Sequence, residues 1–241
     1  MGCSPSHIST ICTGRFYKEW VKAWMDEFGI QPTIGQGKNG TFEAGAVLIQ
    51  PTCQLITGVT QKNQVSPAQL RLLPTGAGQA KDLTNDKINH NFVHWFADGN
   101  RILFSGNEPG KGEKLYVYDM ASGKSQGITP EGVNGTAFAI SPDSVSVAAI
   151  GADQRGYLFP ISGGEPRVIP GLNLGERPIT WSTDGRSLYV YQPGELPARV
   201  FRLDVRSGQR TLWKPLMPSD PAGVESICAV GGSVAWWFSN G

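Results

Sequence analysis

The sequence carries almost no excess of either charge, because its 241 residues include 21 basic and 20 acidic side chains. No basic run is present that would form a footprint on nucleic acid, so we expect no nucleic-acid partner. Apolar runs are short as well, and none approaches the roughly 18 residues that a membrane-spanning helix needs. We therefore expect no membrane span.

Cysteine is scarce, and the four that occur, Cys3, Cys12, Cys53 and Cys228, form no Cys-x-x-Cys pair. We therefore expect free thiols in a reducing compartment. Residues 1–30 also lack the apolar core of a secretory signal. The chain as it stands is expected in the cytoplasm, whereas an upstream export or membrane segment would place it in the periplasm or outside the cell. The start Met1-Gly2-Cys3 matches a lipidation pattern that has meaning only in a eukaryotic cell.

Catalytic motifs are missing too. The sequence contains no Gly-x-Ser-x-Gly, no His-Glu-x-x-His and no phosphate-binding loop. His90 and His94 stand four apart on an expected strand, where that spacing corresponds to about 13 Å. They would point to one face of the strand but could not share a metal ion. We predict no enzyme activity, no metal and no cofactor.

Glycine is abundant, with 31 residues, and part of it combines with aspartate in a repeat. Three times a hydrophobic strand, an Asp-centred turn and a second hydrophobic strand follow one another. The turn aspartates are Asp98, Asp143 and Asp184, which lie 45 and 41 residues apart. A period in the forties built from short strands and tight turns is typical of a β-propeller blade. We expect the large apolar residues of these strands, such as Trp95 and Trp181, to pack between blades.

A second repeat runs in phase with the first. An aromatic-rich strand is closed by a glycine turn, and an anchoring hydrophobic residue follows five positions after the glycine. The glycines are Gly78, Gly123, Gly164 and Gly208, and the anchors are Leu83, Ile128, Ile169 and Trp213. The glycines lie 45, 41 and 44 residues apart, which matches the aspartate series. The agreement of the two series favours a repeated unit of several strands.

Turn chemistry explains the residue types that recur. An aspartate accepts a hydrogen bond from the backbone two residues on, and glycine after it accepts a positive φ without a Cβ clash. Asp98-Gly99 and Asp184-Gly185 fit this pattern. Asp143 is followed by Ser144, so that hairpin is expected to use another turn or to hold serine in a mildly strained conformation. We assign these residues a structural role in turns rather than a catalytic one.

The fold class expected from these patterns is all-β, a partial β-propeller of about three to four blades, each a four-stranded antiparallel sheet, with a short N-terminal helix. The helix is expected over residues 16–28, where aromatic residues recur at helical spacing, and it would pack on the propeller, a partner or a membrane surface. We divide the chain into residues 1–67, with the helix and an irregular or degenerate blade, the propeller repeats at 68–230, and an atypical tail at 231–241.

Closure of the ring is the next question, because closed propellers typically have about 4–8 blades. The repeat supplies three entry turns and four exit strands. A small four-bladed ring would pair the strand at Val224–Val230 with the strand at Leu70–Leu73. We expect instead an open arc whose end blades expose hydrophobic faces and favour self-association.

The strand–turn–strand repeat over about residues 68–228 resembles the TolB-like β-propeller family of bacteria. The runs Asp82–Asp86, Phe104–Gly110 and Tyr189–Pro197 are similar to propellers attached to bacterial receptor-like Ser/Thr protein kinases and winged-helix regulators. The resemblance implies a sensor or interaction domain, with catalysis or DNA binding on another segment. The sequence departs from that family because it lacks kinase motifs and breaks off its last repeat, as a truncated gene would.

Binding is therefore the expected function, at loops that connect strands and blades. The longer loops are Gly106–Glu113, Gly171–Arg177 and Gln192–Ala198, and their charged residues Glu108, Arg177 and Glu195 are candidates for binding or plain surface. We predict a non-catalytic sensor or scaffold module that binds a protein or peptide, as a fragment of a larger bacterial protein. The alternatives are the accessory propeller of a prolyl-oligopeptidase-like serine hydrolase and the regulatory half of a transcription factor.

Overall fold

The computed structural model describes residues 66–74, 79 and 81–216, together with the strand segments 47–49, 55–60, 224–230 and 233–238. The described residues contain strands and turns but no helix. The helix expected over residues 16–28 lies outside them. The described part of the chain accordingly has no helix with the length and apolar character that crossing a bilayer requires.

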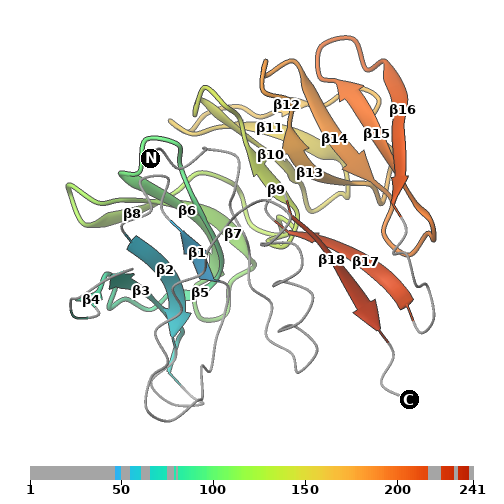
Figure 1. The fold of residues 1–241 in the computed structure, drawn as a ribbon. Coiled ribbons are helices and arrows are strands. Elements are labelled where there is room, and N and C mark those ends of the chain that lie inside the picture. Colours follow the sequence, from blue (N-terminus) through green and yellow to red (C-terminus); the bar gives the residue numbers. More distant parts are fainter. Residues whose placement is uncertain are drawn as a thin grey trace, which may run out of the picture.

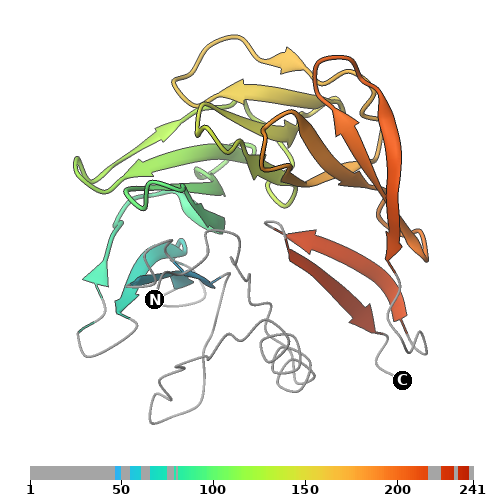
Figure 2. The same cartoon turned by 45° about the horizontal axis from the view of Figure 1, so that its top comes forward.

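The strands form five antiparallel sheets, which follow one another along an arc from sheet A to sheet E (Figures 1 and 2). Sheets A to D have four strands each, and sheet E has two. Sheet A contains β1 (Val47–Ile49), β2 (Leu55–Thr60), β3 (Gln69–Pro74) and β4 (Lys81–Asp82). Sheet B contains β5 (Asn89–Trp95), β6 (Arg101–Asn107), β7 (Lys114–Asp119) and β8 (Lys124–Gly127).

Sheet C contains β9 (Phe138–Ile140), β10 (Ser146–Ile150), β11 (Gly156–Pro160) and β12 (Arg167–Val168). Sheet D contains β13 (Arg177–Trp181), β14 (Ser187–Tyr191), β15 (Ala198–Asp204) and β16 (Arg210–Leu216). Sheet E contains β17 (Val224–Val230) and β18 (Ser233–Phe238). In each four-stranded sheet the strands lie in chain order, and neighbouring sheets meet through first strands, as β13 meets β9 and β5 meets β1.

The sheet order bears on the expected closure and on the boundaries drawn from the sequence. β17 pairs with β18, while β3 pairs with β2 and β4, so the four-bladed ring that would join β17 to β3 does not form. Sheet A joins strands on both sides of residue 67, and sheet E joins strands on both sides of residue 230. The segment expected to be an irregular blade therefore contributes β1 and β2 to the first four-stranded sheet.

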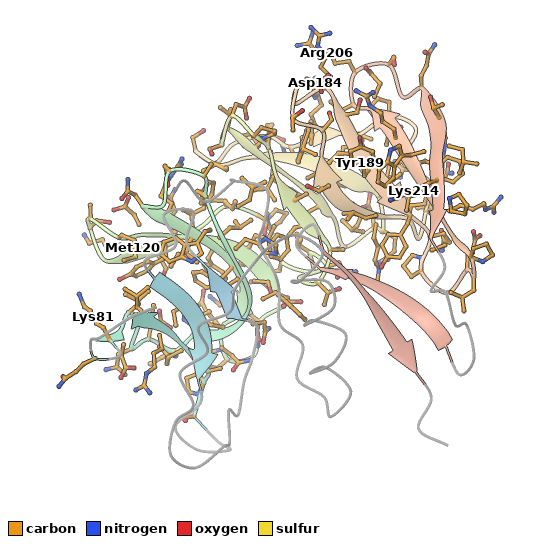
Figure 3. The ribbon with its side chains drawn as sticks, viewed as in Figure 1. Lys81, Met120, Asp184, Tyr189, Arg206 and Lys214 are labelled. Carbon is orange, nitrogen blue, oxygen red and sulfur yellow. The ribbon has the colours of Figure 1, made fainter. Side chains whose placement is uncertain are left out.

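The Asp turns occupy the hairpin between the first and second strands of sheets B, C and D. In each, the aspartate Oδ1 accepts a hydrogen bond from the backbone N–H two residues on, at 2.8 Å for Asp98, 3.1 Å for Asp143 and 3.0 Å for Asp184. In Figure 3 the end of sheet D that carries the Asp turn is marked by two labelled residues. Asp184 lies in the turn between β13 and β14, and Arg206 lies in the turn between β15 and β16. The repeat identified in the sequence is therefore a repeat of turn geometry.

The residue after each aspartate has a positive φ. The angle is 67° at Gly99, 57° at Ser144 and 66° at Gly185. Ser144 thus adopts the backbone conformation of its glycine counterparts, which is unfavourable for a residue with a Cβ. This confirms the expectation of mild strain at the third-sheet hairpin and the alignment of the three repeats.

The core lies between sheets, because alternate residues of each central strand point to opposite neighbours. In β6, Ile102 and Phe104 pack toward sheet A, whereas Leu103 packs toward sheet C. In β14, Leu188 and Val190 pack toward sheet C. Trp95 and Trp181 are buried between sheets, as expected. Since sheets B, C and D are each hydrophobic on both faces, stacking against neighbouring sheets is what stabilises them.

Two expectations from the sequence are corrected by β-bulges. One concerns the second repeat, and the other concerns the two histidines. Leu83, Ile128 and Ile169 occupy equivalent places, since each N–H donates to a carbonyl at the start of the third strand at 2.9 Å. Trp213 does not, because a bulge opposite Val200 and Phe201 leaves it 50% exposed. The prediction that Trp213 anchors its sheet was therefore wrong.

The histidines of β5 do not share a face. A register shift between His90 and Val93 adds a residue to β5 and reverses the alternation after it. The ring of His90 stacks on Phe104 on the sheet A side, with centroids 4.3 Å apart. His94 meets Phe138 of sheet C edge-on, at 4.8 Å. The two imidazoles thus lie on opposite sides of sheet B, contrary to the expectation from their spacing.

Candidate functional site

The loops singled out in the sequence lie at the end of the sheets opposite the Asp turns. Glu108 pairs with Lys111 in the β6–β7 loop, with Oε2 and Nζ 2.8 Å apart. Glu195 pairs with Arg199 at 3.1 Å. The hydrogen bond from Lys111 holds the pKa of Glu108 below its usual value. Arg177 is the half-buried first residue of β13. Among the described residues, no ion pair or hydrogen bond joins any two of the three candidates. Glu108 lies on a loop of sheet B, whereas Arg177 and Glu195 belong to sheet D.

A buried carboxylate lies next to Arg177. Glu176 is only 5% exposed, and Arg210 of β16 donates to both of its carboxylate oxygens, at 2.5 and 3.1 Å. The backbone N–H of Asn173 donates to the same carboxylate at 2.9 Å. These contacts hold the connection between sheets C and D against β16, the outer strand of sheet D. Glu176 is therefore fully engaged by structural partners.

Glu113 has a similar role between sheets B and C. Its carboxylate accepts hydrogen bonds from Asn91 Nδ2 at 3.0 Å and from the backbone N–H of Gly135 at 3.2 Å. A Cβ at position 135 would overlap the Glu113 carboxylate, so this close approach requires glycine. The polar groups at the loop end thus stabilise the connections between blades.

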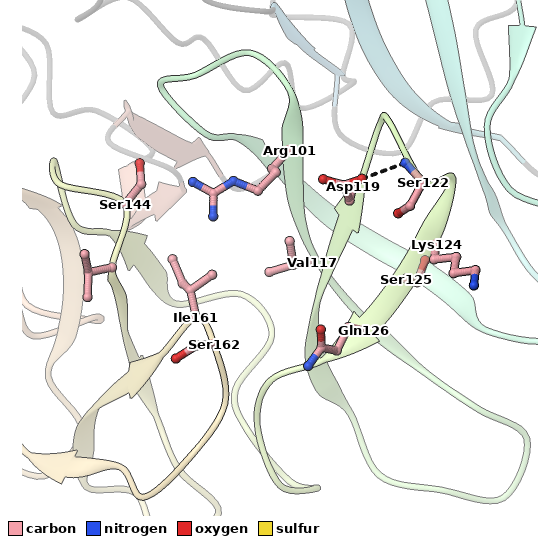
Figure 4. A pocket seen from close by; sticks show the side chains of 11 residues that line it. Arg101, Val117, Asp119, Ser122, Lys124, Ser125, Gln126, Ser144, Ile161 and Ser162 are labelled. Atoms are coloured by element: carbon pink, nitrogen blue, oxygen red, sulfur yellow. Dashed lines mark hydrogen bonds between the residues drawn. The ribbon is translucent and has the colours of Figure 1, made fainter.

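We consider as a candidate site a groove between sheets B and C (Figure 4). It lies at the end of the sheets that carries the Asp turns. This groove has a volume of about 680 Å³. One wall comes from sheet B and the other from two turns of sheet C. The lining residues are Arg101, Val117, Asp119, Ser122, Lys124, Ser125, Gln126, Ser144, Val145, Ile161 and Ser162.

Strand pairing explains the sheet B wall. Val117 lies opposite Gln126 and Asp119 opposite Lys124 across the β7–β8 pair, so these four side chains share one face. Val117 belongs to the core between sheets B and C, which shows that this face is directed toward sheet C. The turns β9–β10 and β11–β12 supply the other wall, where Val145 is 62% exposed.

The charged groups of the groove differ in how they are satisfied. Arg101 pairs with Asp98 at 2.8 Å and lies over the ring of Phe96 at 4.4 Å. Asp119 accepts a hydrogen bond from the backbone N–H of Ser122 at 2.7 Å, shown dashed in Figure 4, and this bond is the main reason that its pKa is lowered. Lys124 is exposed and forms no ion pair with any described residue.

The lining of the groove combines polar and apolar groups. It offers hydroxyl groups, an amide, two cations and a carboxylate around the apolar side chains of Val117 and Ile161. The described histidines, His90 and His94, are buried in β5 and do not line it. The described residues also contain no group of three or more His, Cys, Asp or Glu side chains that could hold a metal ion.

The groove was missed in the sequence because its walls come from segments on two different sheets. The signal that could have revealed its sheet B wall is the alternation Val117, Asp119 and Lys124, Gln126, with polar residues where a core face would continue. The turn residue Ser144 was identified for its backbone conformation, and the structure also places it on the groove.

Comparison with solved structures identifies the architecture. TolB from Acinetobacter baumannii matches with a TM-score of 0.56 at 15% identity, over 77% of this chain and 47% of that chain. The fold is a TolB-like β-propeller. A putative TolB from Agrobacterium tumefaciens matches this TolB-like propeller with a TM-score of 0.55 at 18% identity, over 76% of this chain and 65% of the other. This chain thus spans between about half and two thirds of those TolB chains.

A TolB-like propeller is also a part of larger proteins. A puromycin hydrolase matches with a TM-score of 0.55 at 14% identity, over 74% of this chain and 30% of that one. No family model matches the sequence, and no curated protein sequence matches it. At these identities the likeness establishes the fold of the TolB-like propeller alone.

Proposed function

We propose that this TolB-like propeller is a non-catalytic module that binds a protein or peptide, and that it does so at the groove between sheets B and C. The observation that carries the proposal is the groove itself, which is open, partly apolar at its base and lined by hydroxyl, amide and cationic groups. Such a mixture suits polypeptide, which presents apolar side chains and backbone polar groups together.

The role of sensor or scaffold in a larger bacterial protein is part of the same proposal. It is supported by the share of the matched chains that this propeller covers, from 30% of the puromycin hydrolase to 65% of the putative TolB. Attachment to a Ser/Thr kinase or a winged-helix regulator remains a proposal from the sequence. Reading the gene on both sides of this coding sequence tests it, and an uninterrupted hydrolase domain there would contradict it.

The alternative proposal is an accessory propeller of a serine hydrolase. The likeness to the puromycin hydrolase favours it, because that chain contains a propeller of this kind within a longer polypeptide. A hydrolase domain encoded beside this sequence would support it. A kinase or winged-helix domain in the same place would exclude it.

Panning of a phage-displayed library of random linear peptides on the purified chain tests peptide binding. We expect enriched peptides whose affinity falls several-fold in Val145→Arg, because Val145 is an exposed apolar residue of the groove. Leu174→Arg is the matched control, since Leu174 is 68% exposed and does not line the groove. Failure to enrich any peptide, or equal loss in both variants, would contradict the proposal.

A further inference from the structure

The outer strands of the four-stranded sheets differ in how readily they could pair with another polypeptide. Exposed edge strands present unpaired backbone groups, and proteins block them by shortness, bulges, lysine or proline. β4 and β12 have two residues each. β16 has seven, but it contains a bulge beside Trp213, followed by Lys214 and Pro215. β8 has four residues in regular register with β7 and contains no proline, and its one lysine, Lys124, lies on the face directed toward sheet C.

The backbone of β8 has two residues whose polar groups face outward. Ile128 N–H donates to Leu115 at 2.9 Å, which makes that pair a hydrogen-bonded one. Bonding alternates along an antiparallel pair, so Gln126 and Lys124 also bond to β7. The N–H and C=O groups of Ser125 and Gly127 then point away from β7, at the open edge of sheet B. Among the described strands, none pairs with this edge of β8.

The charged residue of the edge strand itself is Lys124, and Asp119 lies opposite it on β7. Lys124 lies on the face of β8 directed toward sheet C, is exposed, and forms no ion pair with any described residue. Across the groove Val145 offers an exposed apolar surface. A strand added to β8 would direct alternate side chains into this space, where a carboxylate would meet Lys124 and an apolar side chain would cover Val145.

We propose that β8 accepts an extended peptide segment as a fifth strand of sheet B, with an acidic side chain of that segment directed to Lys124. This inference rests on the proposed peptide-binding function and gives it a binding mode and a class of ligand. The segment would be held by backbone hydrogen bonds to Ser125 and Gly127, and the acidic side chain would set its preference.

The test uses the displayed peptide library and four variants of the full chain. Lys124→Glu should weaken the peptides selected on the wild-type protein by roughly tenfold, and peptides selected on this variant should carry Lys or Arg instead of Asp or Glu. Lys87→Glu is the matched control, because Lys87 is exposed on the connection from β4 to β5, at the other end of the sheets. It should leave affinity unchanged.

Ser125→Pro tests the backbone part of the proposal. Proline at this position removes an outward N–H without removing a hydrogen bond to β7, and edge strands tolerate such a proline. Binding should fall at least tenfold, while Ser125→Ala should bind as the wild-type protein does. Amide exchange at Ser125 and Gly127 should slow when peptide binds, which gives a readout on the unmodified chain.

The outcomes separate this inference from the proposed function. If the enriched peptides bind Lys124→Glu and Ser125→Pro as tightly as they bind the wild-type chain, strand addition at β8 is overturned, whereas the proposal of peptide binding stands. Peptides without acidic residues that still lose affinity in Ser125→Pro would overturn the assignment of Lys124. The absence of any enriched peptide would contradict the proposed function itself.

Discussion

Buried His94 makes the stability of the propeller dependent on pH. The side chain is 6% exposed between sheets B and C, and burial lowers its pKa from 6.5 to about 4. The folded state therefore keeps the imidazole neutral at a pH where the unfolded chain binds a proton. Stability is fully present above the unfolded pKa and falls as the pH drops from about 6.5 toward about 4.

The size of the loss follows from the shift in pKa. Each unit corresponds to about 1.4 kcal/mol, so a shift from 6.5 to about 4 corresponds to a free energy of unfolding lowered by about 3 kcal/mol in acid. This is a large fraction of the stability of a typical domain. The pKa of His90 is also lowered, chiefly by burial and despite the hydrogen bond with Asp86, so His90 adds to the loss in the same direction.

Urea unfolding followed by tryptophan fluorescence, repeated across this pH range, measures the effect. His94→Gln removes the titrating group, and its unfolding free energy should fall less between about pH 7 and pH 4.5 than that of the wild-type chain. The turn aspartates Asp143 and Asp184 do not account for a change in this pH range. Because their pKa values are lowered, their contribution to the free energy of unfolding is lost only below about pH 4. An identical pH dependence in the wild-type chain and His94→Gln would refute this account of His94.

Further predictions concern the turns, the buried ion pair and turnover. Asp184→Ala should lower the free energy of unfolding by roughly 0.5–2 kcal/mol in urea titration, because it loses the bond to Arg186 N–H. Ser144→Gly should be neutral or stabilise by up to about 1 kcal/mol, since φ is already positive there, and marked destabilisation would disprove the alignment of the repeats. Glu176→Gln should destabilise by about 2 kcal/mol through its buried contacts with Arg210, whereas Glu195→Gln, in an exposed pair, should change stability by under about 0.5 kcal/mol. The purified chain should show no kinase, peptidase or esterase turnover, and an activity abolished by one substitution within residues 68–228 would contradict this.

The sequence was sufficient for features that depend on local chemistry. The Asp turns, the positive φ expected from the place of Ser144 among its glycine counterparts, and the burial of Trp95 and Trp181 all follow from short-range patterns repeated in phase. The TolB-like architecture followed from the same repeat. These features could be predicted because turn conformation is set by a few adjacent residues.

The features that were missed depend on pairing between strands. An inserted residue in β5 moved His90 and His94 to opposite faces, and another in β16 moved Trp213 to the surface. A bulge is defined by the partner strand as much as by its own sequence. β1 and β2 were also not predicted as regular strands, because a strand as short as the three residues of β1 carries little periodicity.

The groove could not be predicted for a related reason, since it joins β7 and β8 of sheet B to turns of sheet C. Sheet stacking decides which side chains meet there. The candidates Glu108, Arg177 and Glu195 were chosen for loop position, and their roles stay predictions, as do kinase association and self-association. Lipidation at Cys3 concerns residues outside the described part of the chain.

Amide hydrogen exchange of the full chain, with and without a peptide enriched from the displayed library, tests the binding of polypeptide at the groove most directly. We predict slower exchange confined to β8 and to the turns around Ser144 and Ile161, which line the groove. Protection confined to the loops of Glu108, Arg177 and Glu195, at the opposite end of the sheets, would contradict the assignment of the groove as the binding site.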